Sequence, residues 1–191
     1  IYTLSLHDAL PIFLTFVRAA LGQLRSPYVG RTEPEQVLMH LAETWEILIR
    51  TDRDGPEVLS NSDDKRTVFS TWMEDQAFIV DTVQMTLAKH GYDHTIGFNL
   101  VLSVGRDDKG QVVRIQDPNE RLESITRFEI ASVAPDELTM LTDQIQTNLN
   151  LSKQVAADFQ AMTRLVNRSA SQLSGRSTDN EKGTHSPNEC S

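Results

Sequence analysis

The chain has 191 residues, a formal net charge of −9 and a pI of about 5.0. This acidic balance, with lysines and arginines scattered singly among acids, disfavours nucleic-acid binding. No apolar run approaches the roughly 20 residues of a membrane span, and a single cysteine, Cys190, cannot form an internal disulfide, so we expect a cytoplasmic protein.

The chain starts without an initiator methionine, and its first twelve residues resemble translated sequencing-adaptor sequence at the end of an assembled read. We therefore expect residues 1–12 to be a non-native leader without selected structure, and His7 and Asp8 are not interpreted as a catalytic pair. From Phe13 to Leu24, apolar residues fall on one helical face, which predicts a first helix.

A second helix is predicted after a short loop. Thr32-Glu33-Pro34-Glu35 matches a capping box with proline in the first turn, and the helix is expected to run to about Arg50. His40 lies off its apolar stripe and is interpreted as a solvated surface residue. Thr51 to Lys65 is rich in Asp, Gly, Pro, Asn and Ser, which indicates a connecting loop.

A strand–helix–strand unit follows. The β-branched and aromatic stretch from Thr67 to Met73 favours a strand, and Asp75 is expected to cap the helix that comes next. Gly91 is a natural left-handed stop for this helix. The stretch from Thr95 to Val104 alternates apolar and polar residues, which is typical of a sheet with one packed face and one polar face.

The rest of the predicted sheet consists of two further strands. Gly105 to Gly110 indicates a turn, after which Gln111 to Gln116 and Ser124 to Ile130 are predicted to be strands. Pro135 opens a long helix with apolar residues at helical spacing to Val166. From Ser169 to the end the composition is polar, and residues 169–191 are expected to be a disordered tail.

Motifs that carry chemistry are mostly missing from this sequence. It contains no phosphate-binding GxxxxGK[ST] motif and no dinucleotide GxGxxG motif. His90, Asp93 and His94 could form a ligand set, but Gly91 lies between the histidines, so a polar loop is the favoured interpretation. Asp81 either interacts with the positive end of its helix or contacts a partner domain. We therefore predict no catalytic, cofactor-binding or metal-binding residues in this chain.

The order of these elements suggests a ferredoxin-like sandwich, and the stretch from Phe69 to Met85 resembles the first ACT-like segment of the large bacterial NAD-specific glutamate dehydrogenases. The match continues through the Gly91 stop, the Arg106-Asp107-Asp108-Lys109-Gly110 turn and the stretch from Glu123 to Ile130. The resemblance covers about residues 13–166. It implies an α+β fold in which an antiparallel sheet packs against two helices after a helical N-terminal segment.

The same resemblance implies a domain division and a function. It assigns residues 13–65 to a helical lead-in and loop, and residues 66–168 to an ACT-like domain. The catalytic, NAD-binding part of such enzymes lies far downstream, so this chain would be a non-catalytic regulatory or assembly fragment without bound cofactor. Its expected partners are other domains or subunits of the parent enzyme, or a second copy in a homo-oligomer.

A free-standing ACT-type sensor of amino acids is the alternative, and two departures from the ACT pattern count against it. Many ACT domains bind amino acids at a glycine-containing turn between the first strand and the first helix, which here is Glu74-Asp75-Gln76-Ala77. The candidate ligand or interface residues at this turn are Asp75, Gln76, Phe78 and Asp81. This turn contains no glycine, which makes close backbone approach of a ligand harder. The strand expected to close the sheet after the second helix is also missing from the pattern.

Overall fold

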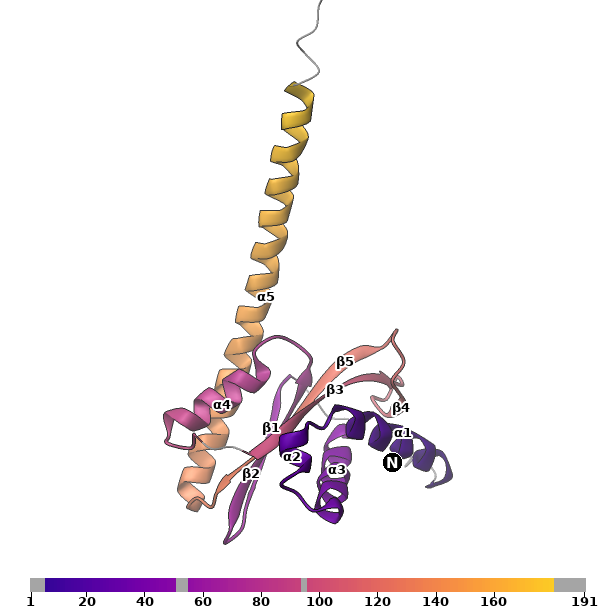
Figure 1. The fold of residues 1–191 in the computed structure, drawn as a ribbon, viewed down its shortest axis with the longest axis vertical. Coiled ribbons are helices and arrows are strands. Elements are labelled where there is room, and N and C mark those ends of the chain that lie inside the picture. The colour runs from indigo at the N-terminus through magenta and orange to yellow at the C-terminus, as the bar shows by residue number, and fades with distance from the viewer. Residues whose placement is uncertain (1–5, 51–54, 94–95, 181–191) are drawn as a thin grey trace, which may run out of the picture. The chain divides into compact units, whose positions relative to one another are not determined.

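The computed structural model describes residues 6–50, 55–93 and 96–180. The chain forms two compact units, Ile1–Ser152 and Lys153–Ser191, and each is described by itself. In the first unit, a five-stranded antiparallel sheet has helices on both faces (Figure 1). This α+β architecture, with a helical N-terminal segment before the sheet, confirms the fold class that the sequence predicts.

The elements follow one another in the order helices, hairpin, helix, three strands and helix. The helices are α1 (Leu6–Gln23), α2 (Ser26–Val29), α3 (Pro34–Leu48), α4 (Ile79–Lys89) and α5 (Pro135–Asn180). The strands are β1 (Glu57–Ser62), β2 (Arg66–Glu74), β3 (Ile96–Arg106), β4 (Val112–Ile115) and β5 (Arg121–Ala131).

The strands lie in the order β1-β2-β5-β3-β4, and β2 and β5 form the long central pair. In their register Phe69 lies opposite Phe128 and Trp72 lies opposite Ile125. Because side chains alternate along a strand, these two pairs point to opposite faces of the sheet. The sheet is therefore covered on both faces rather than on one.

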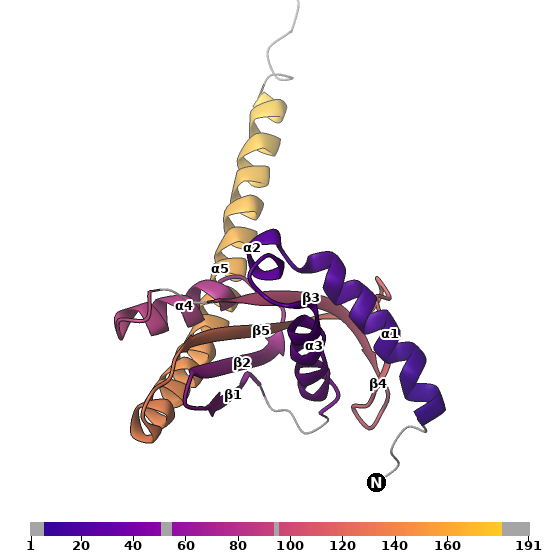
Figure 2. The ribbon, with the colours of Figure 1, turned by 60° about the horizontal axis from the view of Figure 1, so that its bottom comes forward.

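Each face carries its own apolar core. On one face, α1, α2 and α3 pack against the even-numbered residues of β3, including Leu100 and Leu102, which confirms the predicted alternation of that strand. On the other face, α4 and the first turns of α5 pack on β2 and β5 (Figure 2). The second core consists of Phe69, Met73, Ile79, Val83, Leu87, Phe128, Ile130, Leu141, Ile145 and Leu149.

The sequence pattern lacks the closing strand expected after the second helix of the ACT-like domain. In the structure, a strand that precedes β2 in the chain forms that edge of the sheet instead. The prediction of a loop from Thr51 to Lys65 is wrong, because Glu57–Ser62 forms β1 and pairs with β2 at the edge of the sheet. Its outer edge is covered by Gln146 of α5, which accepts from the Val58 N–H at 3.1 Å and donates to the Pro56 carbonyl at 2.7 Å. Backbone pairing and this amide, with Val58 packed against the second core, hold a largely polar strand in place.

Two predicted helix caps are wrong. Helix α3 has Glu33 as its N-cap, without a side-chain hydrogen bond, although Pro34 does occupy the first turn as predicted. Asp75 does not cap α4, because its backbone N–H donates to the Leu122 carbonyl at 2.8 Å and so extends the β2–β5 pairing. The helix starts later, after Phe78, and Gly91 follows its end with the expected positive φ of 88°.

Two helices are longer than predicted. Helix α1 begins at Leu6 instead of Phe13, so residues 6–12 are helical and not unstructured, and Ile12 packs against the first core. Helix α5 continues to Asn180, so the prediction of disorder is wrong for residues 169–180; no proline interrupts backbone hydrogen bonding there. Residues 181–191 lie outside the described part. None of the described helices is apolar enough over sufficient length to cross a membrane.

Candidate functional site

The four residues of the predicted turn occupy different environments. Asp75 is half-buried, and burial raises the pKa of its carboxyl. The side chain of Gln76 donates to the Ser152 hydroxyl at 3.3 Å. Phe78 has a left-handed backbone with φ of 74° and an exposed ring, and Asp81 lies exposed in the first turn of α4. The structure places these side chains along one turn but does not gather them around a common pocket.

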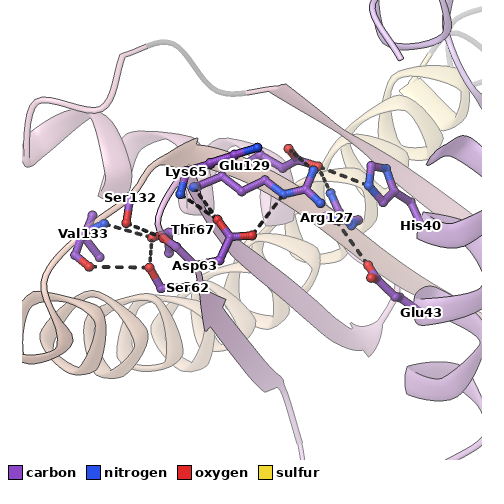
Figure 3. Close-up of polar contacts among 11 residues, drawn as sticks. His40, Glu43, Ser62, Asp63, Lys65, Thr67, Arg127, Glu129, Ser132 and Val133 are labelled. Atoms are coloured by element: carbon purple, nitrogen blue, oxygen red, sulfur yellow. Dashed lines mark hydrogen bonds and ion pairs between the residues drawn. The ribbon is translucent and has the colours of Figure 1, made fainter. Parts of the chain in front are cut away.

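A polar cluster that the sequence analysis missed lies on the face of the sheet that α1, α2 and α3 cover, where α3 packs on β5. Its members come from α2, α3, β2 and β5, and Figure 3 shows most of them around the guanidinium of Arg127. We call this set the Arg127 cluster: Tyr28, His40, Glu43, Arg66, Arg127 and Glu129.

His40 is 2% exposed, so its interpretation as a solvated surface residue is wrong. Its Nδ1 lies 2.5 Å from the Tyr28 hydroxyl, and its Nε2 lies 3.7 Å from a Glu129 oxygen. Burial, and then the positive charge of Arg127, lower the pKa of His40, while burial raises the pKa of Tyr28. We therefore assign a neutral imidazole whose Nδ1 accepts the hydrogen bond of a protonated Tyr28 hydroxyl.

Arg127 is 2% exposed and contacts two carboxylates. Its Nη1 donates to Glu129, and its Nη2 donates to Glu43 at 3.3 Å. Arg66 adds a second cation to Glu129 at 3.1 Å. Burial alone would raise the pKa of Glu129, but the hydrogen bond and charge of Arg127, with Arg66, hold that pKa below its usual range. The two arginines and two glutamates of the cluster therefore form an ion-pair network between the sheet and α3.

A second arginine, Arg106, ties the end of α3 to the other end of the same face. Its Nε and Nη2 both donate to Glu123 at 2.7 Å, and its Nη2 also donates to the Leu48 carbonyl at 2.9 Å. Trp72 donates to Glu123 at 2.6 Å and lies under the Arg106 guanidinium. A pocket of about 200 Å³ adjoins this arrangement, and Glu74 but none of the four predicted turn residues lines it.

The histidines considered as metal ligands do not form such a site among the described residues. His90 Nε2 lies 2.7 Å from Gln144 Oε1 of α5, which gives it a structural partner. His94 lies outside the described residues. Within residues 6–50, 55–93 and 96–180, no three His, Cys, Asp or Glu side chains are grouped so as to hold a metal ion.

The signal for the Arg127 cluster was present in the sequence. Alternation along the predicted strand from Ser124 to Ile130 puts Thr126, Phe128 and Ile130 on one face, which leaves Arg127 and Glu129 on the other. A face with charged residues is expected to be exposed to solvent unless another element covers it. Here the covering helix is α3, and its Glu43 lies more than 80 positions before Arg127 in the chain. Charged residues in period two on a central strand are a sign of such buried pairing.

Comparisons with known proteins agree with the fold. The family model described as "Glutamate dehydrogenase, ACT1 domain" matches residues 16–145. The chain is also 35% identical over 133 residues to an NAD-specific glutamate dehydrogenase of Pseudomonas aeruginosa. That match covers 62% of this chain but 8% of the relative, so the chain spans a small part of that enzyme. No solved structure matches the chain. Because the family model covers more than half of its residues, the chain belongs to the glutamate dehydrogenase ACT1 domain family.

Proposed function

We propose that this chain is a non-catalytic regulatory or assembly module of an NAD-dependent glutamate dehydrogenase, an enzyme that oxidatively deaminates glutamate to 2-oxoglutarate. The family match supports the parent enzyme. The relative's name links that family to NAD, which the module itself is not expected to bind.

The observation that carries the assembly role is the apolar surface of α5 in the second unit. Val155, Phe159, Met162 and Val166 repeat at intervals of four, three and four residues and are each more than half exposed. This spacing places them in one seam along the helix, as in helices that pack on other helices. Burying two such side chains contributes about 1.5–3 kcal/mol each, which is enough to direct association.

A paired substitution in the full-length enzyme that contains this domain tests the assembly role. We expect Phe159→Ser with Met162→Ser to weaken subunit or domain association more than tenfold, because about 3 kcal/mol or more of apolar burial is lost. Sedimentation velocity gives the association, and the rate of NAD-dependent glutamate oxidation gives the effect on activity.

The control uses two exposed positions on the opposite side of the same helix. Gln154→Ser with Ala157→Ser has the same spacing of three residues and should leave association and activity unchanged. If the Phe159 and Met162 variant assembles as well as the control, the assembly role is refuted. Stoichiometric binding of NAD to this chain alone, measured by calorimetry, would contradict its non-catalytic role.

A further inference from the structure

Two arginines on the face of the sheet that α3 covers, Arg106 and Arg127, use the same edge of the guanidinium differently. On Arg106, Nε and Nη2 hold both oxygens of Glu123 at 2.7 Å. On Arg127, the same edge holds a single contact, from Nη2 to Glu43 at 3.3 Å, and Nε has no hydrogen-bond partner among the described residues. A buried donor without a partner costs about 1–3 kcal/mol, so the Nε–H of Arg127 is an unfilled hydrogen-bonding position.

A pocket of about 270 Å³ adjoins Arg127. Its walls come from α3, β1, β2, β5 and the turn between β1 and β2, and they are mainly polar. The lining includes Glu43, Asn61, Asp63, Arg66, Ser70 and Arg127. This volume suits a ligand smaller than a drug-sized molecule.

Glu43 is the one partner of Arg127 that can leave at little cost. Its side chain is 51% exposed, whereas that of Glu129 is 15% exposed and is also held by Arg66. Figure 3 shows Glu43 and Glu129 approaching the Arg127 guanidinium from different sides. Rotation of Glu43 into solvent would uncover the Nε–Nη2 edge while Glu129 keeps its contact with Nη1.

We propose that the Nε–Nη2 edge of Arg127 binds the carboxylate of a small molecule that occupies this pocket and displaces Glu43. Guanidinium and carboxylate match in a planar, two-bond geometry, as Arg106 and Glu123 demonstrate in this fold. With Glu43 withdrawn, two arginines and the carboxylates of Asp63 and Glu129 remain, so local charges balance. This balance favours a ligand with one carboxylate over a dicarboxylate. The site is independent of the assembly role proposed for α5.

Nuclear magnetic resonance of the arginine side chains tests this proposal directly, with sodium propionate as the probe. In a ¹⁵N-labelled sample of the whole chain, the Nε–H signal of Arg127 should shift saturably during the titration, because a new acceptor reaches that proton. The Nε–H signal of Arg106, which already has its acceptor, should move little. Sodium chloride at matched ionic strength is the control; an equal shift with chloride, or no shift at Arg127, would overturn the proposal.

Replacement of the displaced residue provides the second test and avoids disturbing the buried Arg127. Glu43→Ala removes the competing carboxylate, so propionate should bind at least threefold more tightly than to the unmodified chain. Glu46→Ala changes another exposed glutamate of α3 and should leave the affinity unchanged. If Glu43→Ala binds propionate no more tightly than the unmodified chain, Glu43 is not a competitor and the proposal is wrong.

Discussion

At the scale of single residues, His40 links the helical layer to the sheet through its protonation state. The neutral ring accepts from Tyr28 and lies beside Arg127 and Glu129, with Glu43 and Arg66 also near it. Its folded pKa is lower than its unfolded value of about 6.5. The unfolded chain therefore binds more protons in this range, and folding stability is lost as the pH falls from about 6.5.

We expect the free energy of unfolding to fall between pH 7 and pH 5, and the His40→Phe variant to lose this dependence. At pH 8 that variant should be about 1–3 kcal/mol less stable, because the Tyr28 hydroxyl is left without its partner. Urea unfolding at several pH values measures both effects. His90→Gln is the control and should keep the pH dependence; a His40→Phe profile parallel to that of the unmodified chain would rule out this role.

At the scale of elements, the sequence predicts a helix or strand correctly where the segment itself has a regular apolar pattern. It does not predict a strand that forms only because another segment supplies its hydrogen-bond partners. The strands near Phe69 and Leu100, and the start of α5 at Pro135, follow from alternation and helical spacing. Strand β1 does not, since its Ser and Asn residues form a strand only because β2 and Gln146 supply hydrogen-bond partners.

The candidate sites show the same contrast between local sequence pattern and contacts with distant segments. Sequence spacing located the turn at Asp75, but not the Arg127 cluster, because His40 and Arg127 come together only through the packing of α3 on β5. The alternation along β5 places Arg127 and Glu129 on one face, but no periodicity within α3 indicates that this helix covers them. The predicted domain boundary at residue 66 and the ligand or interface role of the turn stay predictions.

The start of α4 offers a test of backbone strain. Phe78 adopts φ of 74°, a conformation that asparagine tolerates and that β-branched residues strongly disfavour. We expect Phe78→Val to be less stable than Phe78→Asn by about 1 kcal/mol or more. Both substitutions remove the same exposed ring, so the difference between their free energies of unfolding isolates the backbone term. Equal stabilities would show that the turn readily adopts another conformation.

At the scale of the whole molecule, the first unit is a sheet covered on both faces, and the part of α5 in the second unit carries an apolar seam of its own. In the first unit, Leu141, Ile145 and Leu149 of α5 are fully buried in the second core. In the second unit, Phe159 and Met162 of the same helix are exposed. An apolar seam of this kind is expected to be covered in the protein that uses it.

A cryo-electron microscopy structure of the full-length enzyme that contains this domain shows most directly whether another domain or subunit covers the apolar seam of α5. We predict that Val155, Phe159, Met162 and Val166 lie buried against another domain or subunit, with the sheet and both helical layers as described. A map in which these four side chains face solvent in the assembled, active enzyme would contradict the assembly role.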